Sequence, residues 1–141
     1  MRDIQSDKID TSHQILRPPG WPRPRGYAHG IAARGRIICL GGQIGWDETE
    51  TLKSGFIPQC RQALQNIVAL LAEAGATPAN LVRMTWYVVD IDLYNSLLPE
   101  LGQVYRDTLG KNFPAMALVQ VVNLVETGAL VEIEATAVIN D

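Results

Sequence analysis

The segment 129–138, ALVEIEATAV, places the strongest restriction on the fold of this chain. Successive side chains of a β-strand point to opposite faces of the sheet, so Glu132 and Glu134 share one face of a strand. The other face is wholly apolar and consists of Val131, Ile133, Ala135, Ala137 and Ile139. The chain must therefore cover one face of a sheet with apolar groups, and it leaves a second face that carries two carboxylates.

The rest of the chain supplies both strands and helices. Apolar periodicity, glycine and proline predict strands at 27–33, 36–42, 82–90, 115–124 and 129–139, and helices at 56–74 and 92–110. Pro99 either begins or kinks the second helix. Short connections at 34–35 and 126–128 predict two hairpins, and a further strand is expected near 13–16. The predicted fold is α+β, with two helices on one face of a mixed sheet.

The acidic face of the last strand also carries apolar residues, Leu130 and Val138. A sheet face of this mixed kind is usually buried against another subunit. We therefore expect Glu132 and Glu134 at a subunit interface, or in a pocket formed there.

The charge is unevenly distributed, with a net +4 in residues 1–40 and a net −7 in residues 41–141. The acidic bulk argues against binding nucleic acid, and no apolar run approaches the ~20 residues that span a bilayer. Cys39 and Cys60 lack the spacing of a zinc site or a disulfide framework, so we expect no metal and a cytoplasmic location. The 141 residues fit one domain at 1–141, with 1–11 as a loose tail.

Six stretches, in order along the chain, together resemble one known family. They are GYAH (26–29), ICLGGQI (38–44), QCRQALQNIVALLAEAGA (59–76), VRMTWYVVDI (82–91), FPAMALVQV (113–121) and GALVEIEATAVI (128–139). This combination is similar to the Rid family, also called YjgF, of reactive-intermediate deaminases. The resemblance implies a chorismate-mutase-like α+β fold and a homotrimer whose sheets form a central barrel, with clefts between subunits. It also implies hydrolysis of small enamines and imines to 2-ketoacids and ammonia, without a cofactor.

The resemblance assigns roles to particular residues. Glu132 matches the acid that positions the attacking water, and Tyr27 matches a tyrosine of the substrate pocket. Gly41 and Gly42 match the SG of a family SGQ motif. The substrate cleft would further contain Met116, Ala117 and Leu118, where backbone groups near 42 and 117 would stabilise developing charge.

The sequence also departs from the family pattern. Met116 stands where archetypal members have the arginine that binds the substrate carboxylate, Leu118 where they have cysteine, and Gly102 where they have asparagine. Methionine lacks the fixed fork of donors of arginine, so the usual amino-acid-derived imines are expected to bind poorly. Arg23 and Arg25 are candidates to supply an anion-binding charge from another direction.

Each candidate residue has an ordinary structural alternative. Glu132 can be a structural acid with a hydrogen-bonding partner, and Tyr27 can pack at a strand edge. Gly41 and Gly42 can form a bulge, and the apolar residues of 116–118 can be core. The basic residues can belong to a solvated surface.

The hypothesis from sequence is a homotrimeric enamine or imine hydrolase that acts on a small, apolar or aromatic-derived substrate, with Glu132 at the attacking water and with neither nucleic acid nor membrane as a partner. The alternative is a non-catalytic metabolite-binding or regulatory protein of the same fold. A ribonuclease role ranks lower, because no His/Lys cluster is evident and the bulk is acidic.

Overall fold

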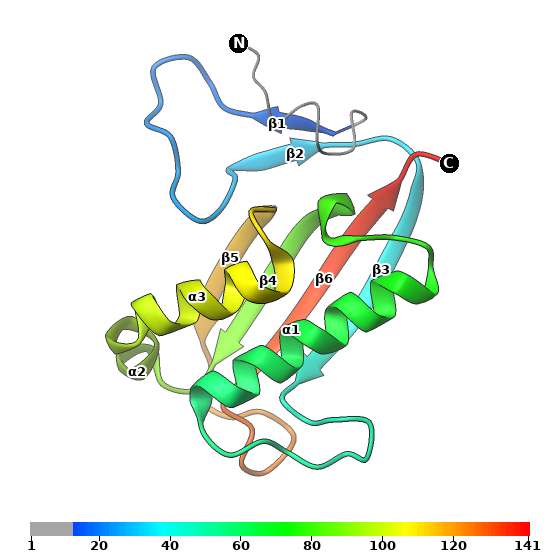
Figure 1. Cartoon of the computed structure of the whole chain (residues 1–141). Helices are drawn as coiled ribbons and strands as arrows, with labels where there is room; N and C mark the ends of the chain where they lie inside the picture. The colour runs from blue at the N-terminus through cyan, green and yellow to red at the C-terminus, as the bar shows by residue number, and fades with distance from the viewer. Residues whose placement is uncertain (1–12) are drawn as a thin grey trace.

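The computed structural model describes residues 13–141, so the predicted tail at 1–11 lies outside the described residues. Its central sheet has the strand order β3 (Arg36–Ile44), β6 (Val131–Ile139), β4 (Leu81–Val88) and β5 (Ala115–Gln120). β4 and β5 are parallel, and β6 is antiparallel to both of its neighbours. A two-stranded sheet of β1 (Gln14–Leu16) and β2 (Gly30–Ala32) lies beyond one end of the central sheet (Figure 1).

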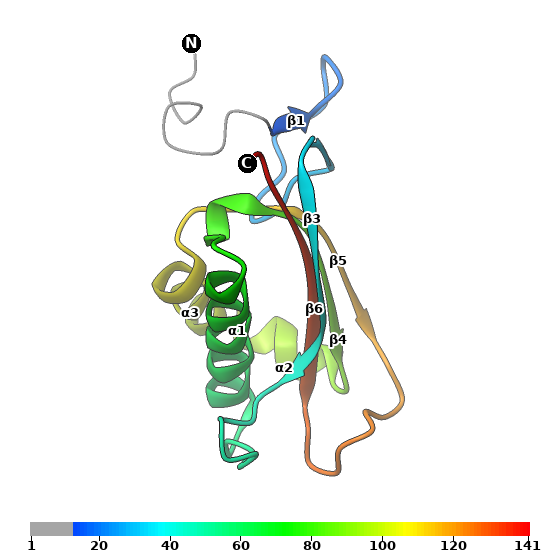
Figure 2. The same cartoon turned by 90° about the vertical axis from the view of Figure 1, so that its right-hand side faces the viewer.

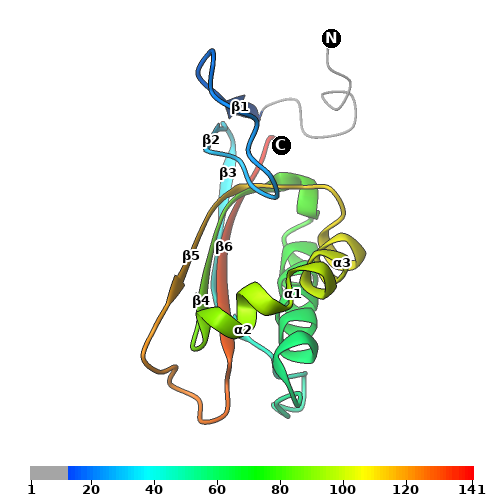
Figure 3. The same cartoon turned by 90° about the vertical axis from the view of Figure 1, so that its left-hand side faces the viewer.

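The helices all lie on one side of the central sheet. They are α1 (Phe56–Glu73), α2 (Ile91–Ser96), α3 (Leu98–Leu109) and the 3-10 turn η2 (Pro78–Asn80). The two side views show that no helix of the described chain covers the opposite face, which we call the open face (Figures 2 and 3). The α+β class and the one-sided helix layer are thereby confirmed.

Local sequence explains where the helices begin and end. In α1 the buried residues recur at helical spacing, and Gly75, with φ of 77°, follows the helix end. Thr77 caps η2 by accepting a hydrogen bond from the N–H of Ala79. Pro99 lies in the first turn of α3 and begins that helix after a break at Leu97, so the predicted helix 92–110 is two helices. No helix within residues 13–141 is both long and apolar enough to cross a membrane.

The apolar face of β6 forms the centre of the core. Its side chains Val131, Ile133, Ala135 and Ala137 are at most 3% exposed. They pack with the helix-facing residues of β4 and the buried face of α1, namely Met84, Trp86, Val88, Phe56, Cys60, Leu64, Ile67 and Leu71. Burial of Cys60 raises the pKa of its thiol to about 12. The apolar face of β6 that the sequence alternation predicted is therefore buried against the helices.

The first predicted hairpin, of 27–33 with 36–42, is wrong. β2 pairs with β1 across the proline-rich loop, which confirms the extra strand near 13–16. β3 pairs with β6 instead. Gly35, with φ of 142°, explains the change of partner, because a Cβ at this position would overlap the carbonyl oxygen of Ile139 at the end of β6.

The second predicted hairpin, of 115–124 with 129–139, is also wrong. α2 and α3 carry the chain back to the starting end of β4, so β5 is added parallel to β4 at the edge of the sheet. β6 takes the position between β3 and β4, where its wholly apolar face is buried against the helices. Residues 121–129 therefore connect an edge strand to a central strand.

Candidate functional site

Glu132 and Gly42 lie against each other where β3 pairs with β6. The register of the two strands shifts between Leu40 and Gln43, so Gly41 and Gly42 form an irregularity in β3. A Cβ at Gly42 would lie 2.7 Å from Cδ of Glu132 and would overlap its carboxylate, whereas a Cβ at Gly41 would meet nothing within 4 Å. Gly42 therefore allows the carboxylate to lie directly on the β3 backbone.

The two carboxylates of β6 share the open face, as predicted, but they have different surroundings. Tyr87, the cross-strand neighbour of Glu132 on β4, donates its hydroxyl proton to Oε2 of Glu134 at 3.0 Å. This hydrogen bond to Glu134 raises the pKa of Tyr87 above its ordinary value. The Glu132 carboxylate is half-buried and forms no hydrogen bond or ion pair within residues 13–141, so it remains available to water or a ligand.

Backbone pairing holds Tyr27 beside β5. The N–H of Ala28 donates to the carbonyl of Pro114 at 3.0 Å, and Ala28 forms a parallel bridge with Ala115. The ring of Tyr27 is 39% exposed and meets the ring of His29 edge-on at a centroid distance of 5.4 Å. The end of the proline-rich loop is thus attached to the start of the edge strand, with the Tyr27 side chain accessible.

A cavity of about 500 Å³ opens between β5 and helices α2 and α3; we call it the β5 cavity. Met116, Ala117 and Leu118 line its sheet side, and Tyr27 and Arg25 line it from the proline-rich loop. Its other walls are mainly apolar and aromatic, and consist of Gly26, Trp86, Tyr94, Leu98, Leu101, Gly102, Tyr105, Arg106 and Phe113. Met116 and Leu118 also pack against the core, so they are at once core residues and cavity walls.

The residues that follow α3 are held in place at this cavity by Tyr105. Its hydroxyl donates to the carbonyl of Asn112 at 2.5 Å, and its ring stacks on Phe113 at 5.3 Å between centroids. Burial raises the pKa of Tyr105. A second wall residue, Trp86, is 2% exposed, and its indole N–H has no acceptor among the described residues. The cavity therefore has one rigid wall and one unsatisfied donor beside it.

A larger and more basic hollow of about 970 Å³ lies between the β1–β2 sheet and the end of the central sheet. Its lining includes Arg17, Arg23, Arg25 and Lys111. Of the two candidate anion-binding residues, Arg25 lines both this hollow and the β5 cavity, whereas Arg23 lines only the hollow. Arg25 is thus the one that shares a cavity with Met116.

The fold separates the predicted site residues into two groups on opposite faces of the sheet. Met116 pairs with Met84, and Met84 pairs with Ala135 on the buried face of β6, so Met116 faces the helices. Glu132 belongs to the open face. One chain therefore brings Tyr27 and Arg25 to the cavity at 116–118, and Gly42 to Glu132, but it does not bring these two groups together.

The sequence interpretation missed Arg106 as a cavity residue. Trp86 is at once a core residue and a cavity wall. Arg106 follows Gly102 by one helical turn, so the two lie on the same side of α3. The expectation that Gly102 departs from the family pattern, together with this spacing, could have singled out Arg106.

Comparisons with known proteins agree with this architecture. A family model described as endoribonuclease L-PSP matches residues 22–139. The human 2-iminobutanoate/2-iminopropanoate deaminase is 34% identical over 105 residues, which cover 73% of this chain and 73% of that protein. A RutC family protein of Aquifex aeolicus is 35% identical over 125 residues, which cover 87% of this chain and 97% of that protein.

Solved structures show the same likeness. The Rid family protein YyfB from Yersinia pestis has a TM-score of 0.81 at 29% identity, with 91% of this chain and 99% of that chain covered. RidA from the Antarctic bacterium Psychrobacter sp. has a TM-score of 0.65 at 31% identity, with 89% and 99% covered. The family model, the similar sequences and the similar structures agree with the resemblance seen in the sequence. This chain belongs to the Rid (YjgF) family.

Proposed function

We propose that this protein hydrolyses small imines or enamines to a carbonyl compound and ammonia, with Glu132 holding the attacking water. The observation that carries the proposal is the Glu132 carboxylate, which lies over Gly42, half-buried and without a hydrogen-bonding partner within residues 13–141. Relatives that are named 2-iminobutanoate/2-iminopropanoate deaminases, at 34–35% identity, support the reaction type.

The chemistry requires one group that accepts and returns a proton. The water oxygen attacks the carbon of the C=N bond, and Glu132 takes a proton from that water as the C–O bond forms. Glu132 returns this proton to the nitrogen, which gives a neutral carbinolamine. The same carboxylate then moves the hydroxyl proton of the carbinolamine to the nitrogen, so that the C=O bond forms as the C–N bond breaks and ammonia leaves. An enamine would first take a proton at carbon and become an imine. Backbone N–H groups near 42 and 117 are candidates to stabilise the developing charge.

We further infer that a second copy of the chain completes the site, in the expected homotrimer. Glu132 and the β5 cavity lie on opposite faces of the sheet, so a neighbouring copy has to bring its carboxylate to the cavity of this one. The open face supports such an interface, because Ile37 and Val119 are 66% and 45% exposed there. β3 and β5 are also edge strands of the described sheet and can pair further.

Ammonia release by Glu132→Gln tests the proposal, and Glu134→Gln is the matched control on the same face of the same strand. We expect the Glu132→Gln variant to lose turnover of freshly generated imines and enamines while its thermal unfolding stays near that of the native protein. The control should keep activity, because an amide oxygen can still accept the hydrogen bond from Tyr87. Full activity of Glu132→Gln would refute the assignment.

The apolar walls of the β5 cavity favour a second candidate function, that of a non-catalytic metabolite-binding protein. A ligand-induced rise in melting temperature without ammonia release from any imine would support it. The family model is described as an endoribonuclease, and salt-sensitive RNA binding with cleavage would support that reading instead. The net charge of −7 in residues 41–141 argues against it.

A further inference from the structure

The walls of the β5 cavity are suited to a bulky apolar or aromatic group. Trp86, Leu101 and Tyr105 are each at most 8% exposed and line it together with Met116 and Leu118. The volume of about 500 Å³ lies within the range of small-molecule sites. A ligand with a one- or two-carbon side chain would leave most of this apolar space unfilled.

Arg106 supplies a cation to the same cavity, where it lies beside Gly102 on α3. A Cβ at Gly102 would lie 3.4 Å from Nη1 of Arg106, so the guanidinium lies close to the helix surface at the glycine. Nη2 of Arg106 donates to Oε1 of Gln103 at 3.2 Å, which is a neutral acceptor.

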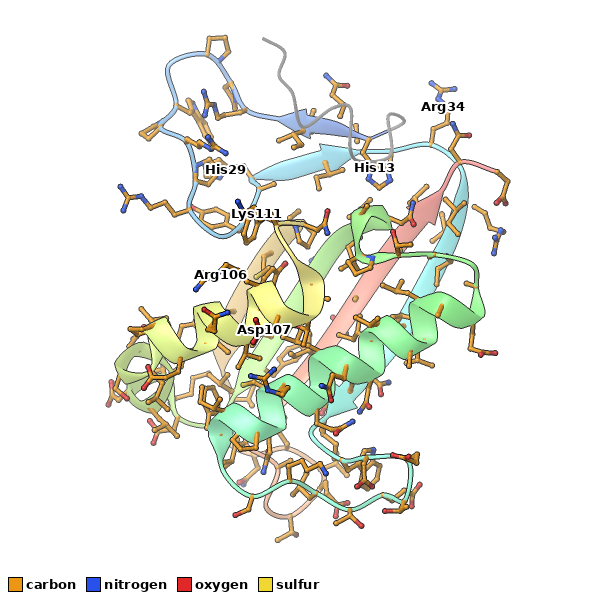
Figure 4. The ribbon with its side chains drawn as sticks, viewed as in Figure 1. His13, His29, Arg34, Arg106, Asp107 and Lys111 are labelled. Carbon is orange, nitrogen blue, oxygen red and sulfur yellow. The ribbon has the colours of Figure 1, made fainter. Side chains whose placement is uncertain are left out.

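No carboxylate of the described chain neutralises Arg106. Its neighbour Asp107 lies on the side of α3 that faces α1, where Oδ2 is 3.5 Å from Nη1 of Arg61 (Figure 4). The other oxygen of Asp107 accepts a hydrogen bond from Gln103 at 2.8 Å. Arg25 also lines the cavity and forms no ion pair within residues 13–141.

None of the described residues that line the β5 cavity is Asp or Glu. Two guanidinium groups without anionic partners beside an apolar cavity favour a ligand that joins a carboxylate to an apolar body, because guanidinium matches carboxylate geometry.

We propose that the β5 cavity binds 2-imino and 2-keto acids with a bulky apolar or aromatic side chain, and that Arg106, assisted by Arg25, holds their carboxylate. The inference rests on the proposed function in that the C=N group would meet Glu132 of a second copy. Arg106 on α3 then supplies the carboxylate contact that Met116 on β5 cannot make. The expectation that the usual amino-acid-derived imines bind poorly then applies to those with small side chains.

Isothermal titration calorimetry of the full-length protein with phenylpyruvate, its methyl ester and pyruvate tests the inference. The native protein should bind phenylpyruvate about tenfold or more tightly than the ester, and more tightly than pyruvate. Arg106→Gln should abolish most of the preference for the acid over the ester and leave the Kd of the ester within about twofold. Arg61→Gln is the matched control, because Arg61 is a half-exposed arginine on α1 that does not line the cavity.

Equal affinity of the native protein for acid and ester would overturn the carboxylate site. An undiminished preference in Arg106→Gln would overturn the role of Arg106, and tighter binding of pyruvate would overturn the bulky side chain. Ammonia release from the corresponding imine separates the two proposals. Arg106-dependent binding of phenylpyruvate without release refutes only the deaminase, whereas release with equal affinity for acid and ester refutes only this inference.

Discussion

The two groups of site residues differ in how the chain builds them. The carboxylate corner, which comprises Gly41, Gly42 and Glu132, is produced by backbone pairing of two strands and leaves no space between the glycine and the acid. The β5 cavity is produced by side chains from a loop, two helices and an edge strand around open space. A strand register holds reacting groups within narrow limits, whereas a cavity wall can change composition without loss of the fold.

The largest effect is expected where the carboxylate corner has no room. Gly42→Ala should reduce ammonia release about a hundredfold, roughly 2.7 kcal/mol of activation free energy, because the new methyl group displaces the Glu132 carboxylate. Gly41→Ala is the control, since a Cβ there meets nothing within 4 Å. Steady-state rates of both variants measure the difference. Equal activity of Gly42→Ala and Gly41→Ala would show that the close packing of Gly42 against Glu132 does not matter for catalysis. The carboxylate corner would then tolerate substitution as a cavity wall does.

A smaller effect is expected at the rigid wall of the cavity. Tyr105→Phe removes the hydroxyl that donates to the carbonyl of Asn112, and should lower the free energy of unfolding by about 1–2 kcal/mol. Tyr94→Phe is the matched control, because Tyr94 lines the same cavity without a side-chain hydrogen bond in the described chain. Urea unfolding of both variants should show a lower midpoint for Tyr105→Phe alone. A similar loss in both would mean that the hydroxyl of Tyr105 contributes little.

The smallest effect is expected on the open face, in alkaline solution. The hydrogen bond to Glu134 raises the pKa of Tyr87 in the folded protein, so the folded state holds this proton more tightly than the unfolded chain. The contribution is present below the ordinary tyrosine pKa of about 10 and is lost as the pH rises above it. Tyr87→Phe should therefore flatten the decline of stability above pH 10. Unfolding curves from pH 8 to 11 test this, and a parallel decline in both proteins would contradict it.

Sequence patterns predicted the positions of the helices and strands better than they predicted which strands pair with each other. The alternation along 131–139 and the apolar repeat of 56–74 describe local geometry, and both appear as predicted. The two hairpins were wrong because a short polar connection shows that the chain turns, not which strand it then pairs with. The contact of Gly35 with β6 and the α2–α3 crossover decide those pairings, and both depend on residues distant in the sequence.

The same limit applies to the candidate site. The sequence by itself determined that Glu132 and Glu134 share a face and that a glycine pair precedes Gln43. The resemblance added the expectation that Met116 replaces a family arginine. Only the tertiary structure decided that Glu132 and Met116 occupy opposite faces of one sheet, and that Arg106 reaches the cavity beside Met116. The physical reason is that side-chain periodicity follows from the geometry of a single strand or helix. The face that each strand presents to its neighbours, and the helix that covers it, follow from packing between distant segments.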